Sequence, residues 1–283
     1  MTSIAKKLAT RPLGDVRVLA RDETETDWQA DDCCTLVNAS GSSPLVLVCE
    51  HASNHIPDEF GDLGLSADAR QSHIAWDPGA LGVATELSSV LDAPLLVQNV
   101  SRLVYDCNRP PDEASAIPEK SEIYSIPGNA NLPQSERDRR TRLYYDPFRL
   151  RLSAVVEEAL ARFGAPVLAT IHSFTPIYFG QPRTVELGIL HDEDARLADF
   201  LLASMTSRES MRIERNQPYG AADGVTHTLR FHALPKGIPN VMIEIRNDLI
   251  ATEMDQKKMA ATLARYFASA IGQFASNEEG MAH

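Results

Sequence analysis

The chain has 283 residues, of which 43% are hydrophobic and 23% charged, as is typical of a globular protein and not of a disordered one. Acidic residues outnumber basic ones by 39 to 27, and the formal charge of −12 repels phosphate backbones, so we expect no nucleic-acid partner. We expect no membrane partner either, because no apolar run approaches the roughly 20 residues that cross a bilayer, and residues 1–15 lack the apolar core of a secretory signal. The four cysteines include no CxxC pair, which indicates a reducing compartment and predicts a cytoplasmic location.

Apolar runs alternate with stretches of helical periodicity along most of the chain. Residues 1–43 are polar and weakly periodic, and we interpret them as an arm or a peripheral addition. Apolar runs predict strands at 44–49, 94–100, 166–173, 184–190, 211–216 (an edge strand) and 240–245. Helical spacing predicts helices at 78–91, 141–163, 192–205 and 255–274. Asp77 suits the N-cap of the first helix, and Gly164 is expected to end the second. The segment 101–140 is rich in Pro and charge, which predicts a long functional or mobile connection.

This alternation predicts an α/β fold of three layers, in which helices flank a largely parallel or mixed central sheet. A chain of this length can bury a sizeable core. No internal repeat and no convincing linker interrupts the sequence. We therefore expect a single domain over residues 1–283, with its core at 44–275.

Three of the predicted strands end on polar residues that can bind a ligand. These residues are Glu50 and His51, His172 and Ser173, and Glu244 and Arg246. In open α/β sheets, ligands bind at the carboxyl ends of the strands, so side chains that are distant in the sequence should converge on one site. Ser173 and Arg246 are therefore candidates for substrate binding.

His51 and His172 are the candidate metal ligands. Neutral imidazole is the commonest metal ligand in proteins, and catalytic zinc typically takes three protein ligands and one water. For one histidine alone, a hydrogen bond that caps its strand is the simpler interpretation. For two histidines, each at a strand end, a metal site is as well supported as capping. Asp77 is the preferred third ligand, although a helix N-cap would also explain it. The competing third ligands are His55, His73 and Glu50.

Glu244 is the candidate general base. It lies in NVMIEIRND (240–248), a run that otherwise indicates burial, and a buried carboxylate is costly unless it is paired. Burial would raise its pKa toward the range that is useful for proton transfer. The alternative is a structural salt bridge to an arginine such as Arg246 or Arg102.

The segment SRLVYDCNRP (101–110) gathers side chains that can bind an anion. Arg102 and Arg109 can each clamp a carboxylate through two hydrogen bonds, and Asn108 adds an amide. A structural ion network around a turn competes with this interpretation and, for the segment alone, is the stronger one. The sequence has no GxGxxG or Walker motif, and Ser173 lacks the GxSxG elbow, so a nucleotide-binding enzyme and a serine hydrolase have little support.

Seven short motifs, in their shared order, resemble the N-formylglutamate amidohydrolase family. They are CEHASNHIP (49–57), HIAWDPGAL (73–81), SRLVYDCNRP (101–110), IPGN (126–129), ATIHSF (169–174), VELGIL (185–190) and IEIRNDL (243–249). The SR…D-x-NRP and IHS elements are the most specific. The resemblance covers roughly residues 44–270 and implies a zinc-exopeptidase-like fold. Where the best-defined histidine-degradation enzymes have a PHSG pattern, this chain has CEHASNH, which indicates a sister group.

The resemblance also implies roles for individual residues. It implies that His51, a carboxylate and His172 hold zinc, although another divalent transition metal can share such ligands. It implies that Glu244 is the general base and that Arg102 assists at the substrate or the oxyanion. The pair that would grip a substrate carboxylate is Asn108 and Arg109.

One position departs from the related carboxypeptidase pattern, which often places a Glu three residues after the first metal histidine. This chain has Asn54 there, and Asp77 is expected to substitute. The resemblance implies amino-acid degradation through hydrolysis of an N-formyl or N-acyl acidic amino acid, with N-formyl-L-glutamate giving formate and L-glutamate. A deacylase or exopeptidase acting on another acyl-amino acid or small acidic peptide is one alternative. A non-catalytic ligand-binding protein on the same scaffold is the other.

Overall fold

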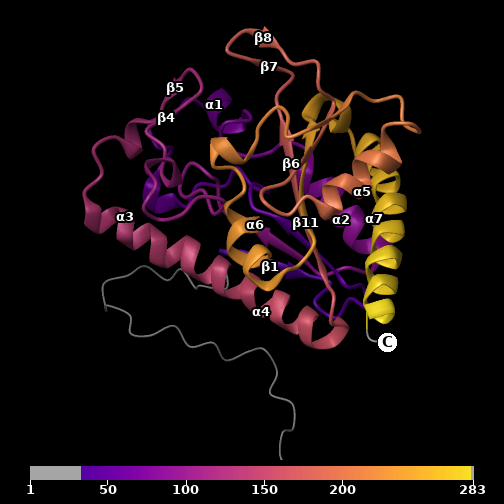
Figure 1. The fold of residues 1–283 in the computed structure, drawn as a ribbon. Helices are drawn as coiled ribbons and strands as arrows, with labels where there is room; N and C mark the ends of the chain where they lie inside the picture. The colour runs from indigo at the N-terminus through magenta and orange to yellow at the C-terminus, as the bar shows by residue number, and fades with distance from the viewer. Residues whose placement is uncertain (1–32, 282–283) are drawn as a thin grey trace, which may run out of the picture.

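A seven-stranded sheet forms the middle layer of the computed structural model, which describes residues 33–281 and their side chains through residue 274 (Figure 1). In spatial order the strands are β1 (Cys34–Val37), β3 (Leu95–Gln98), β2 (Leu45–Cys49), β6 (Val167–Phe174), β11 (Asn240–Arg246), β9 (Leu187–Leu190) and β10 (Ile213–Arg215). β3, β2, β6 and β11 run parallel, and β10 is parallel to β9. β1 is antiparallel to β3, and β9 is antiparallel to β11. The predicted largely parallel or mixed sheet is confirmed, and each of the six predicted strands is present.

Helices cover both faces of this sheet. α2 (Ala80–Leu91), α5 (Arg196–Met205) and α7 (Glu253–Met281) pack on one face, and α4 (Asp146–Phe163) and α6 (His227–His232) pack on the other (Figure 1). Side chains along a strand alternate between the faces, so Leu45 and Leu47 join the core under α2 whereas Val46 and Val48 join the core under α4. The predicted three-layer architecture is therefore confirmed.

The start of α2 differs from the prediction. Its N-cap is Gly79, whose φ of 82° is left-handed, and not Asp77. A side chain at Gly79 would place its Cβ 2.5 Å from the carbonyl oxygen of Ile250, so the chain needs glycine here for two independent reasons. Because glycine makes the sharp entry into the helix, the Asp77 side chain is available to the site described below.

The segment predicted as a long connection contains regular structure. It holds a short hairpin, β4 (Lys120–Ser121) with β5 (Tyr124–Ser125), and the helix α3 (Gln134–Arg140). α3 continues through a π-helical turn at Thr141–Tyr145 into α4, so the helix predicted from residue 141 begins earlier. The run QSERDRR buries only Arg140, which is why it lacks the apolar periodicity that would have predicted a helix. Gly164 ends α4 as predicted.

The other described elements include an edge strand, a short helix and a second hairpin. β1 falls within the predicted arm 1–43, so part of that arm is an edge strand, and residues 1–32 lie outside the described residues. α1 (Ala67–Gln71) and the hairpin of β7 (Ile177–Tyr178) with β8 (Gln181–Pro182) lie at the end of the molecule where β6 ends (Figure 1). None of the described helices combines the length and apolar character that crossing a bilayer requires.

Candidate active site

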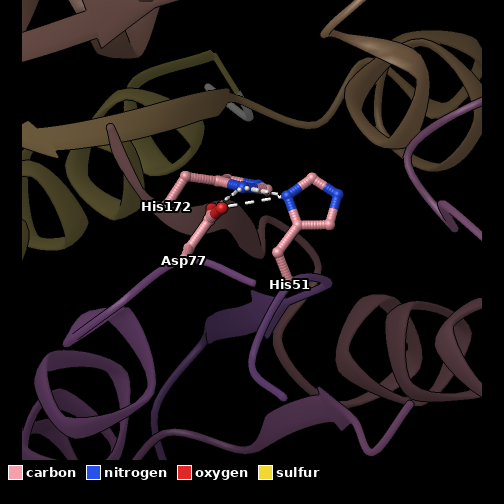
Figure 2. A group of neighbouring side chains, drawn as sticks. All are labelled: His51, Asp77 and His172. Atoms are coloured by element: carbon pink, nitrogen blue, oxygen red, sulfur yellow. Dashed lines mark hydrogen bonds and ion pairs between the residues drawn. The ribbon is translucent and has the colours of Figure 1, made fainter. Parts of the chain in front are cut away.

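Three buried side chains converge at the carboxyl ends of β2 and β6 (Figure 2). His51 follows β2, and His172 lies near the end of the neighbouring parallel strand β6. Asp77 reaches them from the loop before α2, and its Oδ2 lies 2.9 Å from His172 Nδ1 and 3.3 Å from His51 Nδ1. The two Nδ1 atoms are 3.2 Å apart. One oxygen and two ring nitrogens therefore face a single point.

This donor set fits a divalent metal ion. Two imidazoles and one carboxylate, with one position left for water, form a common ligand set of catalytic zinc. Atoms about 2.05 Å from a tetrahedral centre are about 3.3 Å from one another. The observed separations of 2.9, 3.2 and 3.3 Å lie close to that value. The geometry of the three side chains is therefore that of a prepared ligand set.

A carboxylate faces the outer nitrogen of each histidine ring. His51 Nε2 hydrogen-bonds Asp106 Oδ1 at 2.7 Å, and His172 Nε2 makes an ion-pair contact of 3.0 Å with Glu50 Oε2, without hydrogen-bond alignment. Such partners fix the orientation of metal-binding imidazoles and increase their basicity. In both rings they leave Nδ1 directed at the common point.

The charges around this point favour a cation. Burial would raise the pKa of the Asp106 carboxyl, but the adjacent His51 and Arg102 hold it well below its usual range. Burial opposes ionisation of Glu50 and Asp77 too, yet the pKa of each is lowered by the neighbouring histidines. Three ionised carboxylates thus surround two imidazoles and one guanidinium. Although burial opposes it, Glu50 and Asp77 raise the pKa of His172 well above its usual range, so without metal a proton on this ring offsets part of the negative charge. A divalent ion that displaces that proton would take over its role, because three carboxylates, one guanidinium and two neutral imidazoles carry a formal charge of −2.

The competing third ligands lie elsewhere. His55 is exposed, and His73 makes an ion-pair contact of 2.9 Å with Glu122. Glu50 lies against the outer nitrogen of His172 and not at the point shared by the Nδ1 atoms. Asn54 is turned toward α1, where its amide donates to the Arg70 carbonyl. Among the described residues, Asp77 is the carboxylate that completes the three-residue group.

Glu244 lies beside this group on β11. Its backbone is in register with that of His172, and the residue is 3% exposed. Within the described residues its Oε2 has no hydrogen-bond partner, and neither Arg246 nor Arg102 makes an ion pair with it. Burial raises the pKa of this carboxyl to about 7. The described residues therefore show no structural salt bridge at Glu244, contrary to the alternative interpretation of the sequence.

A cavity of about 510 Å³ opens onto these groups. Its walls include His51, Asp77 and Glu244. Arg102 lies at the boundary, where its Nη2 donates to Asp106 at 2.8 Å and its Nη1 lies 3.5 Å from Asp77. The cavity is therefore large enough for a small organic molecule, and it places one next to the candidate metal ligands.

The structure supports only one member of the residue pair that was predicted to bind a substrate carboxylate. Asn108 lines the cavity, but its amide is engaged by the protein, since Nδ2 donates to the Val225 carbonyl and Oδ1 accepts from Thr228 N–H. Arg109 also lines the cavity, and its Nη1 donates to the carbonyls of Asn108 and Gly224. Asn108 therefore holds the loop around residue 225, and Arg109 is the member of the pair with donors to offer.

The two strand-end candidates behave differently. Ser173 lines the cavity, although its Oγ donates to the Pro78 carbonyl and its N–H to Asp77. Arg246 does not line the cavity. Its side chain turns away from it, because Asp248 accepts from its Nε at 2.8 Å and Glu186 lies 3.4 Å from its Nη2. The structure thus gives no support to direct substrate binding by Arg246.

Fold and site together define an α/β protein with a two-histidine, one-carboxylate candidate metal centre beside a buried glutamate. The model of the N-formylglutamate amidohydrolase family matches residues 43–251, and the chain belongs to this family. Membership confirms the resemblance found in the sequence and supports a hydrolase activity.

The solved structures that resemble the chain include two that overlap with most of it. Gene product Atu2144 from Agrobacterium tumefaciens is 53% identical, with a TM-score of 0.83 over 88% of this chain and 97% of that one. N-formylglutamate amidohydrolase from Ralstonia eutropha JMP134 is 22% identical, with a TM-score of 0.59 over 87% of this chain and 98% of that one, and it shares the fold. No curated protein matches the chain.

Asp106, Arg183 and Tyr219 were not predicted as site residues, although Arg183 and Tyr219 line the cavity and Asp106 hydrogen-bonds His51. Asp106 belongs to the segment 101–110, for which a structural ion network was the stronger interpretation, and its contact with His51, 55 residues away, leaves no spacing signal in the sequence. An aspartate two residues before the Asn-Arg pair was the available signal. Arg183 and Tyr219 lie in irregular segments that carry no spacing signal.

Proposed function

We propose that the chain catalyses metal-dependent hydrolysis of the amide of an N-formyl or N-acyl acidic amino acid, with N-formyl-L-glutamate as the preferred substrate. The products would be formate and L-glutamate. The observation that carries the proposal is the buried, unpaired Glu244 carboxyl on the same cavity as a prepared metal-ligand set. Membership of the N-formylglutamate amidohydrolase family supports the choice of substrate.

His51 Nδ1, Asp77 Oδ2 and His172 Nδ1 would hold the metal, for which zinc is the first choice. When bound, such an ion supplies Lewis-acid chemistry, which polarises an amide carbonyl and makes water more acidic. Asp106 and Glu50 would keep the two rings in the orientation that presents Nδ1. These two carboxylates would therefore raise the affinity for the metal without touching it.

Glu244 would move the proton. Its carboxylate accepts a proton from water as the water oxygen adds to the amide carbonyl carbon. The C–N bond then breaks, and Glu244 returns the proton to the departing amine nitrogen. A pKa near 7 suits both steps, because the group can take up and release a proton near neutral pH.

Two arginines would act on the charges of the substrate. Arg102 is held by Asp77 and Asp106 and lines the cavity. It would stabilise the negative charge that develops on the carbonyl oxygen. Arg109 would bind a substrate carboxylate through the nitrogens that are not used on backbone carbonyls. An uncharged substrate would leave that guanidinium unpaired, which would disfavour it.

Metal analysis combined with a substrate panel tests the proposal. We expect about one zinc per chain in protein purified without chelator, and loss of both metal and activity in His51→Ala and His172→Ala. His55→Ala is the matched control, since His55 is exposed and outside the cavity, and it should keep both. Turnover of other acyl-amino acids without turnover of N-formyl-L-glutamate would select the deacylase alternative. Bound metal without turnover of any amide would contradict an enzymatic role and favour the ligand-binding alternative.

A further inference from the structure

Arg183 lines the same cavity and has no assigned role. It follows the β7–β8 hairpin, far in the sequence from Arg102 and Arg109. Within the described residues no carboxylate lies at ion-pair distance from it, whereas Arg102 has two such partners. A guanidinium without an anionic partner on the wall of a polar cavity is a binding group for an anion.

Aromatic rings hold this guanidinium in place. Its central carbon lies 4.2 Å from the centre of the Tyr178 ring, 4.7 Å from that of Tyr219 and 5.6 Å from that of Phe174. Its Nη1 donates to the Tyr219 hydroxyl at 2.8 Å, the one side-chain hydrogen bond of Arg183 in the described part of the chain. Rings that pack around a guanidinium leave the N–H donors at its edge, and that edge is the part that matches a carboxylate.

The backbone of Arg183 is fixed as well. Its N–H donates to the Pro176 carbonyl at 2.7 Å, and its carbonyl accepts from Arg246 Nη1 at 3.3 Å. Glu186 and Asp248 hold Arg246 in turn. Arg246, which was predicted to touch the substrate, is thus a positioning residue for Arg183.

We infer that Arg183 binds the second carboxylate of a dicarboxylic substrate, while Arg109 binds the first. The inference rests on the proposed function and deepens it, because two arginines without carboxylate partners select an N-acyl amino acid with an acidic side chain. Apart from Glu244 and the candidate metal ligand Asp77, the acidic side chains on the same walls are already engaged. Glu122 contacts His73, and Asp223 accepts from Gly220 N–H. Glu122 and Asp223 are therefore poorly placed to bind a cationic group of a substrate.

Binding of two simple acids tests the inference without requiring turnover. Glutarate carries two carboxylates, and butyrate resembles it but carries one. In calorimetric titrations of the full-length protein with its metal, we expect wild type to bind glutarate at least about 10-fold more tightly than butyrate. Arg183→Met should weaken glutarate binding about 10- to 100-fold and leave butyrate binding unchanged. Arg183→Lys should restore part of the loss, since it keeps the charge but not the planar fork.

Arg149→Met is the matched control, because Arg149 also packs on an aromatic ring, that of Phe231, but lies outside the cavity. It should change neither affinity. Equal glutarate affinity in wild type and Arg183→Met, or no preference for glutarate in wild type, would overturn the inference.

A kinetic comparison separates this inference from the proposed function. Arg183→Met should lower kcat/KM for N-formyl-L-glutamate about 10- to 100-fold and leave that for the neutral N-formyl-L-glutamine within about threefold. Equal losses on both substrates would contradict a role in specificity. If the glutarate results hold but wild type hydrolyses neither compound, the proposed function fails and the assignment of Arg183 stands.

Discussion

Replacement of Glu244 by Gln keeps the shape of the side chain and removes its ability to carry a proton. If Glu244 is the general base, kcat should fall about 10²- to 10⁴-fold, which is the usual contribution of a positioned acid–base group. Metal content should stay that of wild type, because Glu244 is not among the three converging ligands. The assay is steady-state hydrolysis of N-formyl-L-glutamate together with elemental analysis of the same preparation.

The same substitution has a consequence for stability in the metal-free protein. The pKa of Glu244 is about 7 when folded, against 4.5 as its ordinary value, so the folded state binds this proton more tightly. Its stabilising effect is fully present below pH 4.5 and is lost as the pH rises to 7. At about 1.4 kcal/mol per pH unit, the loss is about 3 kcal/mol. Gln does not titrate, so the variant should gain about 3 kcal/mol over wild type between pH 4.5 and 7.5.

Urea denaturation of chelator-treated protein at the two pH values measures this difference. Glu193→Gln serves as the control, since Glu193 is exposed, and it should show no such gain. A Glu244→Gln enzyme with near wild-type kcat would refute the role as base. A stability difference that does not change with pH would refute the argument from burial.

Three further predictions concern positions around the site and in the core. Asp106→Asn should weaken zinc binding about 10- to 100-fold in a chelator competition, because it alters the partner of His51 Nε2, and unchanged affinity would contradict this role. His232 is buried, which lowers its pKa to about 3 from 6.5, so wild type should lose stability as the pH falls below 6.5, where only the unfolded state takes up the proton. His232→Phe should therefore gain about 2 kcal/mol over wild type between pH 7.5 and 5 in urea denaturation, and parallel pH profiles would refute the assignment. Gly79→Ala should lower the free energy of unfolding by about 2 kcal/mol or more and weaken zinc binding, since a Cβ would meet Ile250 and displace Asp77. A stable variant with intact zinc affinity would show that the turn is not required.

The inner strands of the sheet could be predicted because they are buried on both faces and are largely apolar, whereas the edge strand β1, which is not fully buried at any position, was not predicted. LVLVC and VLATIHSF are buried at every position, which makes their limits visible in the sequence. α3 could not be predicted, because its polar residues leave no apolar stripe. The start of α2 was placed wrongly because a left-handed glycine replaced the expected aspartate cap.

The site could be predicted where strand ends carried its residues. His51, His172 and Glu244 followed from that rule, and the structure brings them together beside one cavity, although their chemical roles stay predictions. The arginines were harder to predict, because which one faces the cavity depends on loops. Arg246 turns outward to Asp248 and Glu186, while Arg183 is brought in by a hairpin. The expectation of a single domain also stays a prediction.

The place of β11 between β6 and β9 has a consequence for how the chain folds. β11 is the last strand in the sequence, yet it inserts between two strands made earlier. Until it emerges from the ribosome, β6 keeps an unpaired edge of apolar residues, which is the kind of edge that promotes aggregation. We therefore expect slow refolding dominated by this late insertion. The three candidate metal ligands come before β11 in the sequence, whereas Glu244 lies on β11 itself. A chain halted before residue 240 would therefore carry the ligands without the candidate base.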